Sequence, residues 1–204
     1  MLATASEQGP LGPRAAQRGR PRDASRDEAL RQAALEVMAE VGYRALTMDA
    51  VATRARAGKA TIYRRWESKL DLVIDTTNHL ASQRLPEPDT GSLAGDLTEF
   101  LTGFARFLTG PVGKAAQALV GELPHEPELA EAFRGTFLAQ QDAVLERILD
   151  RGRRRGEVRP DAPVRMVVEV AGGALVRRLM LTGQPLDELF VDNLVRGVLL
   201  PLLS

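Results

Sequence analysis

Residues 46–69 read LTMDAVATRARAGKATIYRRWESK, and their pattern predicts a short helix, a tight turn and a second short helix. In the first helix, Met48, Val51 and Ala52 are spaced three and four positions apart, so they form one apolar face. Thr47 precedes this helix and is a favourable N-terminal cap. The first helix therefore has a buried side and a defined start.

The second helix is expected to begin at Gly58 or Lys59 and to bury Ile62 and Trp66. Lys and Arg side chains can bind guanine in the major groove of DNA, and small or methyl-bearing residues can contact thymine. The side of the helix opposite the apolar residues has side chains of these kinds, namely Lys59, Ala60, Thr61 and Arg64. Two short helices with such a face are the arrangement of a helix-turn-helix that reads DNA.

A third helix follows this pair. Ser68 and Asp71 form a capping box that opens it, and the helical pattern continues to about Arg84. Lys69 lies in its first turn, where a cation is unfavourable for the helix dipole. This position indicates that Lys69 binds a phosphate rather than stabilising the helix.

These residues resemble the signature of the TetR (tetracycline repressor) family of transcription regulators. The matching residues are Thr47, Val51, Ala52, Ala55, Lys59 to Trp66, Ser68, Lys69, Leu72 and Val73. The turn departs from the family pattern, because Arg56 and Ala57 stand where the family usually has Gly-Val. A non-glycine residue in a left-handed turn costs on the order of 1 kcal/mol, so we expect strain at this turn.

The resemblance implies a homodimer that binds a palindromic operator in double-stranded DNA. By position in the family pattern, base edges are contacted by Lys59, Ala60 and Arg64. Phosphates are contacted by Thr47, Thr61, Tyr63, Arg65 and Lys69, and by Arg26 near the start of the preceding helix. Arg64 and Arg65 could exchange these roles. In the family, the helix that begins at Ser68 transmits ligand binding to the DNA-binding helices.

The N-terminal part has two expected segments. Residues 1–24 are rich in Gly, Pro, Ala and Arg without helical periodicity, so we expect a disordered basic arm. Within this arm, the sequence from Arg18 to Arg22 resembles the core of an AT-hook. Arg18 and Arg20 could enter a narrow minor groove, or the arm could contact phosphates only weakly. A helix from Ser25 to Gly42 then opens a helix-turn-helix domain that spans residues 25–70.

The charge is distributed unevenly along the chain. The 204 residues have no net charge, but residues 1–70 contain 13 Lys and Arg against 8 Asp and Glu. Residues 71–204 contain 14 Lys and Arg against 19 Asp and Glu. A basic DNA-binding part on an acidic body is expected to resist indiscriminate coating of DNA.

The composition excludes several kinds of site. The chain has no Cys, so it has no disulfide and no thiolate metal site, and its two histidines, His79 and His125, are too few for a typical zinc site. We therefore expect no metal and no cofactor. The sequence shows no signal peptide and no apolar run of about 18 residues that could span a bilayer. These observations predict a cytoplasmic protein, associated with the nucleoid when it is bound to DNA.

Residues 71–204 are predicted to form a helical ligand-binding and dimerisation domain, which gives an all-α fold of about nine helices. Helical spacing of apolar residues, interrupted by Gly and Pro, predicts helices over residues 93–109, 112–123, 127–155, 163–182 and 186–203. Four arginines crowd the end of the third of these, and they form either a second nucleic-acid site or, as we favour, cations at a helix C-terminus. They are Arg151, Arg153, Arg154 and Arg155.

The last two helices are apolar nearly all round, so each needs a second buried face. A second copy of the chain, related by a twofold axis, would supply that face in a four-helix interface. The residues predicted at this interface are Gly172, Gly173, Val176, Phe190, Leu194 and Val198.

Aromatic residues in the body either fill its core or line a cavity for a small hydrophobic molecule, as in members of the family. The candidate ligand-binding residues are Phe100, Phe104, Phe107, Phe133, Phe137 and Met166.

These observations allow three interpretations of the protein's function. The leading interpretation is a sequence-specific transcription regulator, a repressor that a small molecule releases from its operator. The alternative is an architectural minor-groove protein that uses the arm from Arg18 to Arg22, against which the acidic body argues. A helical enzyme or carrier is the third interpretation, but no metal-ligand spacing, Gly-rich phosphate loop or nucleophile with a base is present, so no enzyme is predicted.

Overall fold

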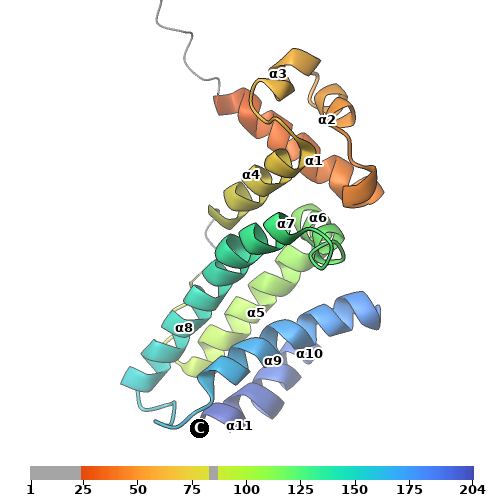
Figure 1. The fold of residues 1–204 in the computed structure, drawn as a ribbon. Coiled ribbons are helices and arrows are strands. Elements are labelled where there is room, and N and C mark those ends of the chain that lie inside the picture. The colour runs from red at the N-terminus through yellow and green to blue at the C-terminus, as the bar shows by residue number, and fades with distance from the viewer. Residues whose placement is uncertain (1–23, 83–86) are drawn as a thin grey trace, which may run out of the picture.

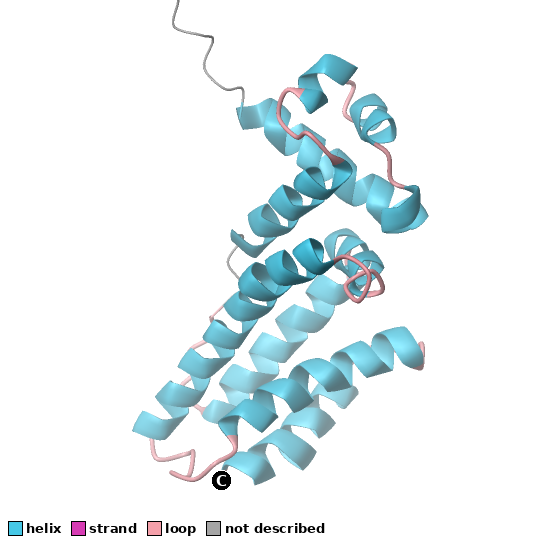
Figure 2. Cartoon of the chain, in the orientation of Figure 1, coloured by secondary structure: helices cyan, strands magenta, loops and turns pink. Residues whose placement is uncertain are grey.

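The protein is described by a computed structural model that covers residues 24–82 and 87–204. Within these residues the elements are helices joined by loops, without a strand (Figures 1 and 2). Adjoining helical segments merge, so the described residues form nine continuous helices. The predicted all-α fold is therefore confirmed. The predicted arm, with Arg18 and Arg20, lies outside the described residues.

Four helices form the N-terminal part: α1 (Ala24–Ala45), α2 (Met48–Arg54), α3 (Lys59–Tyr63) and α4 (Lys69–Ser82). They share a core because each contributes a fully buried apolar residue; these are Leu30, Val51, Ile62 and Leu72. In α1 the backbone leaves the helical conformation at Gly42, which has a φ of 78°. The predicted stop at Gly42 thus appears as a kink, beyond which α1 continues to Ala45.

The body begins with α5 (Leu93–Thr109) and α6 (Pro111–Val120). A long helix follows, made of α7 (Pro127–Ala132), the π-helical stretch η1 (Phe133–Leu138) and α8 (Ala139–Arg154). The last two helices are α9 (Val164–Val176) with η2 (Arg177–Leu181), and α10 (Glu188–Leu194) with η3 (Val195–Leu199) and α11 (Leu200–Leu203). Their apolar faces meet in one core that includes Leu97, Ile148, Leu175 and Leu199, all fully buried.

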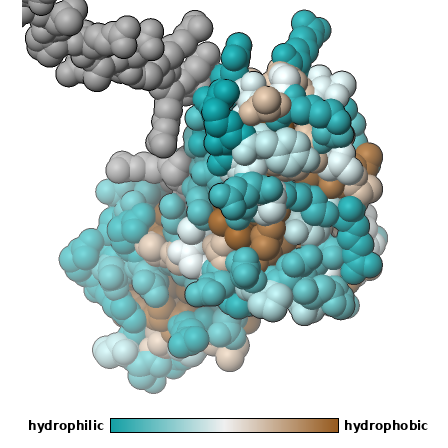
Figure 3. Space-filling model, turned by 45° about the horizontal axis from the view of Figure 1, so that its top comes forward, coloured by the Kyte–Doolittle hydropathy of each residue, from teal (hydrophilic) through white to brown (hydrophobic). Residues whose placement is uncertain are grey.

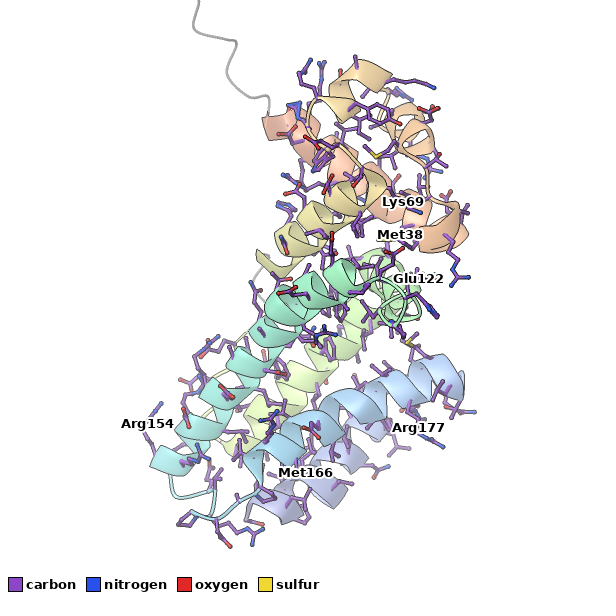
Figure 4. All side chains as sticks on the ribbon, viewed as in Figure 1. Met38, Lys69, Glu122, Arg154, Met166 and Arg177 are labelled. Carbon is purple, nitrogen blue, oxygen red and sulfur yellow. The ribbon has the colours of Figure 1, made fainter. Side chains whose placement is uncertain are left out.

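The two parts meet along α6 and α7. Helix α1 packs on α6, and α4 packs on α7 and η1. Ala115, Leu119 and Leu129 belong to the body but are buried in the same cluster as α1 and α4. An ion pair of 2.9 Å between Arg44 Nε and Glu122 Oε2 adds a polar contact at this junction. Figure 4 shows Glu122 facing the N-terminal part, on the side where Met38 and Lys69 lie.

Three of the four arginines at the end of α8, Arg151, Arg153 and Arg155, pair with acidic groups of the body. Arg151 Nη1 lies 2.6 Å from Glu87 Oε1, and Arg155 Nη2 lies 3.0 Å from the buried Asp96 Oδ2. Figure 4 shows Arg154 at the end of the molecule opposite α3. These contacts support the structural interpretation of the cluster over a second nucleic-acid site.

Candidate nucleic-acid interface and ligand cavity

The helix-turn-helix has the local geometry that its sequence predicts. Thr47 Oγ1 accepts a hydrogen bond of 3.1 Å from Ala50 N and caps α2. Ser68 and Asp71 form the capping box before α4, with Ser68 N donating to Asp71 Oδ2 over 2.9 Å and Asp71 N donating to Ser68 Oγ over 3.1 Å. These caps fix where the helices on either side of α3 begin.

Helix α3 has one buried side and one exposed side. Ile62 is fully buried, and Trp66, just beyond the helix, is buried with it. The exposed side carries Lys59, Ala60, Tyr63 and Arg64, while Thr61 is half-buried. The structure therefore presents to solvent the three residues that were predicted to contact base edges. With the N-terminal part turned toward the viewer, the surface is mostly hydrophilic, with hydrophobic residues in separate patches (Figure 3).

The turn between α2 and α3 contains backbone strain. Arg56 has a φ of 51°, and it is the only non-glycine residue with a positive φ among the described residues. The turn is closed by a hydrogen bond of 2.8 Å from Ala57 N to Ala52 O. Because this conformation costs an L-residue on the order of 1 kcal/mol, the predicted strain is confirmed.

Lys59 is paired within the domain. Its Nζ binds the carboxylate of Asp49 on α2, while 70% of its side chain remains exposed. The hydrogen bond and charge of Asp49 raise the pKa of Lys59 above its usual value. A base contact from Lys59 requires the ammonium to leave Asp49.

Two acidic residues that the sequence pattern did not indicate, Asp75 and Asp27, hold the residues just beyond the end of α3. Asp75 Oδ2 on α4 accepts a hydrogen bond of 3.1 Å from Trp66 Nε1 and another of 2.9 Å from Arg31 Nε on α1. Asp27 on α1 pairs with the mostly buried guanidinium of Arg65. Arg65 thus stabilises the domain in this structure, and its phosphate contact stays a prediction.

Lys69 also has partners inside the domain. Its Nζ donates to Tyr43 O over 3.1 Å and to Arg44 O over 3.4 Å, and it lies 4.2 Å from the centre of the Tyr43 ring. The ammonium therefore binds carbonyl groups near the end of α1, where a cation is favourable. This contact accounts for a cation in the first turn of α4, and the phosphate contact stays a prediction. Thr47 and Arg26, also predicted at phosphates, are exposed.

The body contains an apolar pocket of about 450 Å³, between α5, α6, η1, α8 and α9. This volume is in the range of small-molecule sites, about 300–1,000 Å³. Four of the six predicted ligand residues line it: Phe100, Phe104, Phe133 and Phe137. Its other apolar lining comes from residues such as Leu101, Ala116, Val120, Leu145, Val168 and Met180.

Two predicted ligand residues, Phe107 and Met166, do not line the apolar pocket, so the pocket does not support these two predictions. Phe107 packs behind the wall, with ring centroids 6.1 Å from Phe104 and 5.5 Å from Phe137. Met166 is 52% exposed in the first turn of α9. The sequence could not place Met166, because the rotation of a helix that is apolar nearly all round is not fixed by its pattern.

The predicted dimer residues divide into three groups. Gly172, Gly173 and Val176 line the apolar pocket, so the face of α9 that holds them is directed to that pocket. Leu194 is buried in the core of its own chain, so its assignment to an exposed face was wrong. Phe190 is half-buried, and Val198 is exposed.

Other exposed apolar residues lie on the same pair of C-terminal helices. Leu181 is 79% exposed and Leu189 is 69% exposed, at the hairpin that joins them. Val198, on the last helix, is 40% exposed, so several apolar side chains of these two helices remain uncovered within one chain.

Neither a group of metal-ligating side chains nor a membrane-spanning helix is found among the described residues. In residues 24–82 and 87–204, no three His, Asp or Glu side chains are grouped so that they could hold a metal ion. Among the helices of the same part of the chain, none is both long enough and apolar enough to cross a bilayer.

Helices α2 and α3 form a helix-turn-helix with an exposed polar face, and the domain that contains them packs on a helical body with an apolar pocket. This arrangement defines a helix-turn-helix DNA-binding protein. A family model described as "Bacterial regulatory proteins, tetR family" matches residues 30–76. A second model, "Tetracyclin repressor-like, C-terminal domain", matches residues 87–198. The chain belongs to the TetR family and is a DNA-binding transcription regulator.

Individual relatives agree with this assignment. The chain is 35% identical over 178 residues to the uncharacterized HTH-type transcriptional regulator YdeS of Bacillus subtilis, covering 87% of this chain and 90% of the relative. It is 34% identical over 183 residues to the DNA-binding transcriptional repressor TetR of Mycobacteroides abscessus, covering 89% of this chain and 96% of the relative. The crystal structure of the TetR family regulator SCO0332 is similar, with a TM-score of 0.66, 32% identity, and coverage of 86% of this chain and 97% of that one. These comparisons do not favour an architectural role.

Proposed function

We propose that this protein is a homodimeric repressor that binds a palindromic operator through α3 and leaves it when a small hydrophobic molecule occupies the apolar pocket. Family members bind DNA, act as dimers and often bind small ligands, which supports each part of the proposal. The repressor named among its relatives supports repression. The protein then acts in the cytoplasm, at the nucleoid, and without catalytic activity.

The observation that carries the proposal is the position of α6. Ala116, Gln117 and Val120 line the apolar pocket. Ala115 and Leu119, on the other side of the same helix, are buried in the core of the N-terminal part. A ligand that moves α6 therefore moves a surface on which α1 packs. Because packed helices respond as rigid elements, this contact couples the pocket to the DNA-binding helices.

The proposed base contacts follow from exposure on α3, and the proposed phosphate contacts follow from position in the family pattern. Lys59, Ala60 and Arg64 read base edges in the major groove. Contacts to phosphates orient the domain on the duplex without reading sequence. We assign these contacts to Arg26, Thr47, Thr61, Tyr63, Arg65 and Lys69.

The proposed dimer places two recognition helices on one face of the DNA. The last two helices expose Leu181, Leu189 and Val198 and leave Phe190 half-buried, and in the proposed dimer a second copy of the chain covers these residues. An isologous contact of this kind produces twofold symmetry. The two copies of α3 then enter successive major grooves about 34 Å apart.

A reporter assay tests repression. A duplex that the purified protein selects from random DNA is inserted so that it overlaps the promoter of a reporter gene. The host is a bacterium that does not itself produce this protein. The parent chain should lower expression, and a Lys59→Ala, Arg64→Ala variant present at the same level should not. Equal expression with the parent and the variant, or higher expression with the parent, would contradict the proposal.

A further inference from the structure

The polar lining of the apolar pocket is unbalanced in charge. Its polar side chains are those of Gln117, Gln141, Asp142 and Glu169. Two of these four are carboxylates, and none of the described residues that line the pocket is Lys, Arg or His. Both carboxylates are exposed, so they lie at the rim of the pocket, and the residues that line the pocket supply no positive charge beside them.

Gln141 supplies a second, independent indication of a ligand. Its side chain is only 9% exposed, and its Nε2 has no hydrogen-bond partner among the described residues. Gln117, by contrast, is satisfied, because its Nε2 donates to Leu108 O over 2.7 Å. Since buried polar groups are nearly always hydrogen-bonded, the Gln141 amide is a group that a bound molecule can satisfy.

The two carboxylates lie where the apolar pocket adjoins a second hollow. Asp142 and Glu169 also line an adjacent groove of about 520 Å³, together with Glu146 and Asp150. This groove has two cations, Arg153 and Arg165, against four carboxylates.

Neither cation removes the excess of negative charge. Arg153 pairs with Asp150 over 2.7 Å, at the part of the groove beyond the pocket. Arg165 Nε lies 3.7 Å from Glu169 Oε1, but its side chain is almost fully exposed, so the pair is weak. Burial and the nearby Glu146 carboxylate raise the pKa of Asp142 and outweigh the opposite effect of Arg165. The charge of Arg165 therefore does not offset the effects of burial and of Glu146 on Asp142.

We infer that the ligand of the apolar pocket is a hydrophobic amine, whose positive charge lies between Asp142 and Glu169 while Gln141 hydrogen-bonds a polar atom of the same molecule. The inference rests on the proposed function and adds the chemical class of the ligand. The Phe-rich wall takes the hydrophobic part of the molecule, and the negative groove raises the local concentration of cations. Fatty acids and other hydrophobic anions should bind more weakly than the amine on the same grounds.

Three probes with a common hydrophobic part test the inference: 8-phenyloctylamine, 8-phenyloctan-1-ol and 8-phenyloctanoate. Their affinities for the full chain are measured by titration calorimetry at neutral pH. The amine should bind at least about tenfold more tightly than the alcohol and the carboxylate. Asp142→Asn and Glu169→Gln should each reduce this preference several-fold. Glu131→Gln, an equal change in charge on the exposed side of α7, should leave it unchanged.

A second variant shows that the amine binds in this pocket. A Cβ at Gly172 meets no atom within 4 Å, and Gly172 lines the pocket, so Gly172→Leu should place its side chain in the empty space. This variant should bind the amine at least about tenfold more weakly. Unchanged binding would overturn the inference.

The remaining outcomes separate the inference from the proposed function. Equal or tighter binding of the carboxylate or the alcohol, or no binding of the amine, would overturn the inference. If one of those other probes then released the protein from a selected operator, the proposed function would still stand. Binding of the amine with the expected preference, but without release of DNA, would support the ligand class and contradict ligand-controlled release.

Discussion

The position of Gly113 gives a sharp prediction for α6. A Cβ added there would lie 2.2 Å from Phe107 O and 2.4 Å from Leu108 O, in the last turn of α5. Both are backbone atoms, which cannot rotate away as a side chain can. Because a carbon–oxygen contact needs more than 3 Å, Gly113→Ala must move α6 away from α5 by roughly 1 Å.

The cost of this movement follows from the packing. Overpacked substitutions of this kind typically destabilise by about 1–3 kcal/mol, so we expect Gly113→Ala to lower the free energy of unfolding by that amount. The displaced α6 carries Ala115 and Leu119 with it, and these residues pack on α1. Affinity for DNA should therefore fall as well, by about 0.5–2 kcal/mol.

Urea unfolding measures the loss, with Gly121→Ala as a matched control. Gly121 follows α6, has a φ of −66°, and has no atom within 4 Å of an added Cβ. Gly121→Ala should be neutral, or stabilising by up to about 1 kcal/mol. All proteins are compared at one protomer concentration, because dimerisation contributes to apparent stability. Equal unfolding free energies for the two variants would refute the argument from the α5–α6 contact.

Four further predictions concern single side chains. Lys69→Ala should weaken binding to every duplex and lower the slope of log affinity against log salt concentration by about one, whereas Lys59→Ala should relax sequence preference. Fluorescence anisotropy at several salt concentrations measures both effects. A slope equal to that of the parent for Lys69→Ala would exclude its phosphate contact. Trp66→Phe removes the hydrogen bond to Asp75 and part of the buried ring, so chemical denaturation should show a loss of about 1–2 kcal/mol, while parental stability would mean that this bond contributes nothing. Gln141→Leu removes an unpaired buried donor and should raise the unfolding free energy of the ligand-free protein by about 1 kcal/mol; a decrease would show that the amide is already satisfied.

The helix-turn-helix was predictable because its signals are local. The cap at Thr47 and the capping box of Ser68 and Asp71 each join residues three positions apart, so they are visible in the sequence and present in the structure. The burial of Ile62 followed from helical periodicity, and the strain at Arg56 followed from the absence of glycine at that turn.

What the sequence could not predict depends on contacts between distant residues. Asp75 reaches Arg31, 44 positions away, and in the sequence it resembles any acidic residue on a solvated helix face. Met166 and Leu194 were misplaced because α9 and α10 have apolar residues on several sides, which leaves the rotation of each helix undetermined. The acidic rim of the apolar pocket joins residues of α8 and α9, and no spacing along the chain reveals it.

The central claim is that two copies of α3 read a palindromic operator. Selection of bound duplexes from a random DNA library by the purified full chain, at moderate and at higher salt, tests it most directly. The account predicts a palindrome with half-sites about one helical turn apart, still enriched at higher salt. Recovery of only A·T-rich DNA without symmetry would contradict it, and so would the absence of enrichment at both salt concentrations.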